Sequence, residues 1–423
     1  MISRLKALKT LIAAALFALP LPAFAQSATE LFTPETVAAS GDIRIIGVDG
    51  ETSWLDGGYG KTRFDTDSAN RGFRIEPQAV EGDLIWTPRF TWSLGGTVVA
   101  TAQQGQDNAV DLSEAFLTYK PLLGGGTKLV ARAGLFWPPV SLEHTGPEWR
   151  VRDTITPSAI NSWIGDEVKV GGFEAQMTRS IGAGRLSATL AIFGLNDTAG
   201  TLIAFRGWAL HDQKAVAFGL QPLPPLNPFF AIYTQAAKTR PVIELDNRPG
   251  FYGKLDWAPT AWLDLQAFHY DNRGNPEAVT PTLQWGWRTR FDNIGAVLSF
   301  GDWQVKAQGM AGRTLMGFPE NGRLWVDTSF RSGYVMTTRN FVRGSVSLRA
   351  EAFGTTSIGS ELGRDWSEKG WALTAAGRRD IGKNLSALVE VLHIDSSKEA
   401  RSYIGVAPQQ DQTLVQFALR LHL

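Results

Sequence analysis

The chain has 423 residues, no cysteine, and 41 Lys and Arg against 41 Asp and Glu. Without cysteine it can form no disulfide framework, no thiolate metal site and no thiol nucleophile. The balanced charge gives no electrostatic case for nucleic-acid binding.

Residues 1–25 have the features of a secretory signal peptide. A basic start and an apolar run at 11–19 lead to an A-x-A site that ends at Ala25. We expect cleavage there, which leaves 26–423 as one exported domain with 38 Lys and Arg against 41 Asp and Glu. The alternative is that the segment stays attached as an amphipathic anchor.

The rest of the chain contains no apolar run long enough for a membrane-spanning helix and no linker or change of composition. Its recurrent unit is a segment of about ten residues that alternates in polarity, which indicates strands with one apolar face. The last such segment sets apolar residues against polar ones: Val415, Phe417, Leu419 and Leu421 against Gln412, Gln416, Arg420 and His422.

Counting these segments predicts sixteen strands. They cover 42–49, 72–86, 90–103, 111–120, 127–136, 167–179, 185–195, 250–258, 262–271, 283–300, 303–316, 326–339, 343–357, 370–380, 385–396 and 412–423.

Short and long connections alternate strictly between these strands. A transmembrane antiparallel β-barrel has tight turns at the periplasmic rim and long loops outside, whereas a soluble sandwich or propeller has no reason to sort its loops in this way. The polar face carries more charge than a buried core tolerates, and a wet lumen removes that conflict. We therefore predict an all-β barrel in the outer membrane of a Gram-negative cell, crossing it many times.

The long connection around residues 141–162 is the predicted constriction loop. Pro138, Pro139, Pro147 and Pro157 disfavour a regular helix through most of it. A stiff, charged loop between barrel strands would narrow a pore from inside. The polar residues predicted to line this constriction are Glu143, His144, Glu148, Arg150, Arg152 and Asp153. The alternative is a surface loop with scattered charges.

Strand parity also predicts which charged residues line the lumen. The basic ones are Lys128, Arg132, Arg288, Arg290, Lys306, Arg349 and Arg420. The acidic ones are Glu174, Asp264, Glu351 and Glu390. The excess of cations favours a weak anion preference. Alternatively, these arginines pair with wall and loop carboxylates and select no ions.

Residues 196–249 form a long, apolar, proline-rich excursion. It could fold over the mouth of the barrel, contact a neighbouring subunit, or hold short strands, and the sequence leaves these three alternatives open.

The segment 133–143, with the sequence AGLFWPPVSLE, resembles the start of the constriction loop in the phosphate-selective porin O and P family. Residues 163–167 and 171–174 resemble the way that loop re-enters the barrel wall. The resemblance implies a homotrimeric porin that admits small hydrophilic solutes. It does not carry over phosphate specificity, because Glu148 and Asp153 accompany the loop arginines and no dense basic ladder is present.

Two other classes of function compete with a channel. An outer-membrane lipase or protease would need a nucleophile and base, yet the sequence has no G-x-S-x-G elbow and no H-E-x-x-H zinc motif. His144 is the one histidine in a plausible site. A plugged structural barrel is less expected, because sixteen strands enclose an aqueous bore. We predict no enzyme activity, no metal and no cofactor.

Overall fold

The computed structural model describes residues 31–66, 74–229, 234–320, 322–358 and 364–423. The expected signal peptide lies outside these residues. None of the helices in the described ranges combines the length and the apolar character needed to cross a bilayer.

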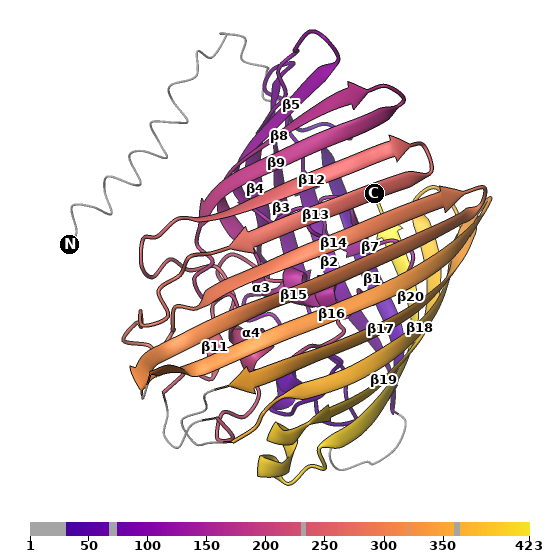
Figure 1. Cartoon of the computed structure of the whole chain (residues 1–423). Coiled ribbons are helices and arrows are strands. Elements are labelled where there is room, and N and C mark those ends of the chain that lie inside the picture. The colour runs from indigo at the N-terminus through magenta and orange to yellow at the C-terminus, as the bar shows by residue number, and fades with distance from the viewer. Residues whose placement is uncertain (1–30, 67–73, 230–233, 321, 359–363) are drawn as a thin grey trace.

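Sixteen antiparallel strands form one closed barrel, in which β1 pairs with both β2 and β20 (Figure 1). The wall consists of β1 (Val37–Asp49), β2 (Arg74–Trp86), β3 (Leu94–Gln103), β4 (Asp111–Tyr119), β5 (Thr127–Phe136), β8 (Val170–Ile181), β9 (Gly184–Gly194), β12 (Gly250–Thr260), β13 (Leu263–Asp271), β14 (Arg288–Phe300), β15 (Trp303–Glu320), β16 (Arg323–Phe341), β17 (Gly344–Ile358), β18 (Glu368–Asp380), β19 (Leu385–Lys398) and β20 (Gln409–His422). The predicted strand number and fold class are confirmed.

The apolar face of the strands forms the outer surface of the barrel. Large side chains on this face are exposed, among them Ile43, Leu190, Ile294 and Leu348 at 61 %, 71 %, 67 % and 62 %. Exposed aromatic residues gather near the short turns, as Trp257 and Trp262 do. An apolar outer band with aromatic residues at its edge is the surface of a barrel that spans the outer membrane.

Two strand boundaries differ from prediction for local reasons. The expected long connection at 317–325 is instead the tip of a long hairpin, because a register shift at Met316 and Pro319 lets β15 and β16 continue pairing. The strand expected from 283 begins at Arg288, because Leu283 has a positive φ of 58° and Trp287 donates its backbone N–H to Asp197.

Among the described residues, two connections on the long-loop side contain α-helices, and two others contain the 3-10 helices η1 (Trp54–Asp56) and η2 (Glu399–Ile404). The β5–β8 connection holds β6 (His144–Thr145), β7 (Arg150–Val151) and α3 (Ala159–Glu167). The β9–β12 connection holds α4 (Thr201–Phe205), β10 (Gln221–Pro222) and β11 (Lys238–Thr239). The helix α3 is short because it starts only after Pro157, with Ser158 as its N-cap.

Candidate pore constriction

The first inward segment, residues 137–169, lies inside the barrel and bonds to strands on different sides of the wall. Gln266 of β13 donates a side-chain hydrogen bond to the Val140 carbonyl at 2.8 Å. Arg420 of β20 donates to the Val151 carbonyl at 2.7 Å. Since a loop can reach such distant strands only through the interior, this connection folds inward.

Carboxylates from the wall and the loop hold the N-terminus of α3. Glu351 of β17 accepts the Ala159 N–H at 2.7 Å, and Glu143 accepts the Ser158 N–H at 3.0 Å. The first N–H groups of a helix lack partners within the helix, and its N-terminus carries partial positive charge. The two acids therefore fix the helix inside the lumen.

Arg349 completes this cluster. Its guanidinium lies 2.8 Å from carboxylate oxygens of both Glu143 and Glu351. Burial alone would raise the pKa of Glu143, but Arg349 and the hydrogen bonds from Ser158 and Asn161 outweigh it and hold that pKa below its ordinary value. Glu143 is therefore an ionised structural group.

Glu390 of β19 anchors the loop just before α3. Its carboxylate accepts the backbone N–H groups of Ile155 at 2.6 Å and Thr156 at 3.0 Å. Two amide donors on one carboxylate remove two orphan polar groups from a buried loop.

Three strands along the wall from β19, Arg150 binds two acids of β2, with its guanidinium 2.5 Å from Glu81 and 2.9 Å from Asp83. Arg420 is paired with Asp42 of β1 at 2.9 Å.

Arg152 differs from Arg150, because its side chain is 57 % exposed and lies 4.0 Å from Asp153. Asp153 is itself buried, and its carboxylate also lies 3.7 Å from Lys306 of β15.

In the same segment Glu148 is buried and His144 is half-buried. The His144 ring stacks on Trp149 with ring centroids 4.4 Å apart, and its Nδ1 lies 2.8 Å from the Ser141 Oγ. Burial lowers the pKa of His144 to about 3, so the ring is neutral. The Glu148 carbonyl accepts a hydrogen bond from Lys214 at 2.6 Å.

The other lumen-facing predictions form a partly paired set. Arg132 of β5 binds Glu174 of β8 at 2.7 Å, and Asp264 of β13 lies 3.5 Å from Arg185. Lys128 is exposed and has no ion pair among the described residues.

The lumen assignment of Arg288 and Arg290 is wrong. In β14, Thr289, Phe291 and Asn293 are buried toward the interior, whereas both arginines are exposed on the outer face. The prediction rested on strand parity, which placed the charged residues of this stretch in the lumen. Phe291 instead points into the interior, where its ring packs on Trp163 of α3 with centroids 5.3 Å apart.

A second inward segment, residues 199–217, was not predicted to enter the lumen. It belongs to the β9–β12 connection, and all its residues are buried except Asp212, which is partly exposed. Its Ala215 N–H bonds the Gly165 carbonyl at 2.8 Å, and its Leu202 N–H bonds the Glu167 carboxylate at 2.8 Å. The apolar run of this excursion was visible in the sequence, but its location inside the barrel was not.

Buried charges join this second segment to α3. Arg206 lies 2.7 Å from the Asp166 carboxylate, and His211 Nε2 lies 3.0 Å from the same oxygen. Burial lowers the pKa of His211 despite Asp166, so Arg206 supplies the charge of this contact. Burial, followed by repulsion from Asp166, raises the pKa of Glu167 to about 7.

Two glycines allow the second segment to sit this close to its surroundings. Gly200 has a φ of 109°, and a Cβ there would lie 2.0 Å from the Thr314 Oγ1 of β15. Gly207 has a φ of 80°, and a Cβ there would lie 1.5 Å from the Glu368 carboxylate of β18. Both positions require a residue without a side chain.

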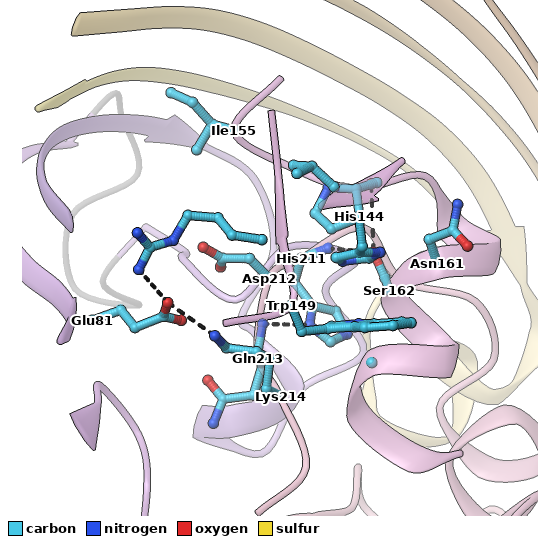
Figure 2. A pocket seen from close by; sticks show the side chains of 14 residues that line it. Glu81, His144, Trp149, Ile155, Asn161, Ser162, His211, Asp212, Gln213 and Lys214 are labelled. Atoms are coloured by element: carbon cyan, nitrogen blue, oxygen red, sulfur yellow. Dashed lines mark hydrogen bonds and ion pairs between the residues drawn. The ribbon is translucent and has the colours of Figure 1, made fainter. Parts of the chain in front are cut away.

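The two inward segments enclose a small cavity (Figure 2). Its volume is about 10 Å³, and it is lined by Glu81 of the wall, by His144, Trp149, Asn161 and Ser162 of the first segment, and by His211 and Lys214 of the second. A cavity of this size holds at most one water molecule. The two segments meet at this cavity, and a larger one of about 130 Å³ lies beside β1 and β2, lined by Ile46, Val48, Arg63 and Gln104.

One acidic group outside the lumen is explained by its loop. Oxygens of Asp197, Glu244 and Asp246 lie within 4.8 Å of one another. Asp197 accepts the Leu245 N–H, and Glu244 accepts the Asn247 N–H at 2.7 Å. These acids organise a turn, and a resident metal is not needed to account for them.

Solved structures show the same architecture. The outer membrane channel DcaP of Acinetobacter baumannii has a TM-score of 0.55 at 10 % identity, covering 92 % of this chain and 99 % of that one. The anion-selective porin of Comamonas acidovorans has a TM-score of 0.52 at 11 % identity, with the same coverage. A loop-deletion mutant of OmpT, an outer membrane protein of Vibrio cholerae, scores 0.51 at 9 % identity, also with that coverage.

No protein-family model and no curated protein matches the sequence. At these identities the structural likeness concerns the fold. The closed sixteen-stranded barrel, its apolar outer band and its solved neighbours together show that this chain has the fold of the outer-membrane porins.

Proposed function

We propose that this protein is a gated outer-membrane channel for passive diffusion of small hydrophilic solutes. The observation that carries the proposal is the meeting of two inward segments at a water-sized cavity inside a sixteen-stranded barrel. In the proposal, residues 141–162 form the constriction and the second inward segment moves away to open it. The loop motif supports a relationship to the phosphate-selective porin O and P family and a homotrimer, without phosphate specificity.

Charge pairing supports only a weak anion preference. Arg132, Arg349 and Arg420 are each bound to a wall carboxylate, so their charge is largely neutralised. Among the predicted constriction and lumen residues that the structure describes, Lys128 and Arg152 remain as accessible cations. A small local excess of positive charge in a narrow bore attracts anions modestly.

The decisive experiment uses the absence of cysteine in this chain. The His211 backbone N–H donates to the Ser162 Oγ at 3.0 Å, so Cys residues at these two positions can approach each other. We expect the Ser162→Cys, His211→Cys double variant to conduct in planar bilayers under reducing conditions. Oxidation should abolish the conductance of the double variant. The conductance of each single variant should be the same with and without the oxidant.

A plugged structural barrel is the second candidate, and the same filled lumen favours it. If the wild-type protein and the reduced double variant are both silent, the barrel is plugged and the channel proposal fails. If the oxidised double variant conducts as well as the reduced one, the channel stands but the second inward segment is not its gate.

We do not propose an enzyme, although the Ser141 Oγ lies 2.8 Å from the His144 Nδ1. Ser141 Oγ also accepts the backbone N–H groups of Glu143 and His144, each at 3.1 Å, which is a local turn. The low pKa of His144 makes it a weak base, and Glu143 is committed to Arg349. A fluorophosphonate probe should therefore leave Ser141 unlabelled.

A further inference from the structure

The outer face of β14–β16 carries arginines where a barrel wall usually faces lipid. Arg288 and Arg290 of β14 and Arg331 of β16 are all exposed outward. None of the three has an ion-pair partner within the described part of the chain. Charged side chains on the lipid face are costly near the bilayer centre and tolerated only toward the interfaces.

The position of these arginines along the wall places them at such an interface. From the short turn upward, the outward residues of β14 are Phe300, Leu298, Ala296 and Ile294. Arg290 lies ten residues from Phe300. At about 3.3 Å per residue and a tilt of about 35–45°, this is roughly 23–27 Å of height, the thickness of the apolar band of such barrels.

The strand register gathers the arginines into one patch. Arg290 lies directly opposite Arg313 of β15, and Arg331 lies opposite Ala311, two positions along the same strand. Like charges directly opposite each other destabilise a sheet. Arg313 is satisfied by Asp327, whose carboxylate lies 2.6 Å from its Nε, whereas Arg290 forms no ion pair among the described residues.

Two acids flank the patch, and neither forms an ion pair with its three arginines in the described part of the chain. Asp292 binds His269 at 2.7 Å, and Asp271, opposite Arg290, accepts the Arg273 N–H at 2.7 Å. Phe318, which is 43 % exposed, packs on the half-buried Trp325 and on the buried Trp285. Aromatic side chains of this kind favour the headgroup level of a membrane.

We propose that Arg288, Arg290 and Arg331 bind the phosphate groups of membrane lipids at the long-loop edge of the apolar band. Guanidinium groups suit this role, because they stay charged and bind phosphate oxygens through paired N–H donors. The proposal rests on the membrane-spanning barrel and not on channel activity, so it can stand or fall independently of the proposed function.

The test is native mass spectrometry of the detergent-purified full-length protein with added lipid A. Its bisphosphoryl form, its monophosphoryl form and phosphatidylcholine serve as the three probes. We expect the Arg288→Gln, Arg290→Gln, Arg331→Gln variant to bind the bisphosphoryl form at least tenfold more weakly. The monophosphoryl form should lose less, and phosphatidylcholine binding should stay unchanged.

The matched control carries the same loss of charge on exposed arginines away from the patch: Arg240→Gln, Arg248→Gln and Arg323→Gln. It should retain binding. The Arg288→Lys, Arg290→Lys, Arg331→Lys variant keeps the charge but loses the paired donors. It should bind lipid with intermediate strength, and this binding shows that substitutions at the three positions leave the protein folded. Equal losses in the patch and control variants would overturn the proposal, since binding would then follow total charge. A change of oligomeric mass with unaltered lipid binding would also overturn it and assign the patch to a subunit contact.

Discussion

The backbone N–H of His211 donates a hydrogen bond to the Ser162 Oγ at 3.0 Å. These residues belong to different connections of the barrel, yet both are buried inside it. The contact marks where the second inward segment closes against α3. In the proposed channel, conduction would depend on how firmly these two segments are docked.

Replacing Asp166 should loosen the docking. In the Asp166→Asn variant Arg206 loses its buried partner, and such a loss typically costs about 3–5 kcal/mol. We expect a higher open probability in planar bilayers and faster proteolysis of residues 199–217. The Asp264→Asn control breaks an exposed pair worth at most about 1 kcal/mol and should leave both unchanged.

Docking should weaken as the pH rises. The pKa of Glu167 is raised from 4.5 to about 7 in the docked state, so this state binds the proton more tightly than a solvated carboxyl does. Docking is therefore strongest below about pH 4.5 and weakens as the pH rises through about 7. The open probability should increase by up to about tenfold per pH unit in this window.

The Glu167→Gln variant should flatten that pH profile, and single-channel recordings from pH 5 to pH 8 would show it. Asp197 also has a pKa raised to about 7, by burial and by Glu244, so Asp197→Asn tests its separate share. A wild-type channel that closes as the pH rises would contradict the assignment.

A side chain at Gly200 should prevent tight docking. The added Cβ of Gly200→Ala would collide with Thr314, and the positive φ adds backbone strain. We expect larger conductance with an intact barrel, seen as unchanged far-ultraviolet circular dichroism. Gly182→Ala, in a short turn with a φ of 59° and open space for a Cβ, controls for strain alone. Equal conductance in both variants would refute the role of Gly200.

Selectivity should respond to the loop arginines unequally. Arg152→Ala removes an exposed charge and should move any anion preference toward neutrality. Arg150→Ala leaves Glu81 and Asp83 without this partner and should shift the preference further toward cations. Reversal potentials in a potassium chloride gradient measure both. An unchanged reversal potential in the double variant would mean that the loop does not set selectivity.

Oligomeric state is predicted from the loop resemblance. We expect a detergent-extracted mass of three chains by light scattering, after correction for bound detergent. A mass near one chain of 46.2 kDa or less would refute the trimer.

The barrel could be predicted from the sequence because its determinants are local. Alternation such as Gln416, Phe417, Ala418, Leu419 and Arg420 specifies a strand and its two faces within a few residues. Turn lengths then specify antiparallel neighbours. The strands and their order depend on little else. Sixteen segments, each predicted from its own residues, therefore match the observed sheet when they are paired in chain order.

The interior was decided by tertiary structure. Parity alone identifies two faces but not which one a bulky residue prefers, and β14 turns Phe291 inward because α3 offers Trp163 to pack against. That partner comes from a loop far away in the sequence, and Arg288 and Arg290 are consequently exposed outside. In the same way, residues 199–217 enter the lumen because Asp166, Glu167 and Gly165 supply matching bonds there. Burial of a loop requires partners for its backbone polar groups, and only the folded barrel brings those partners together.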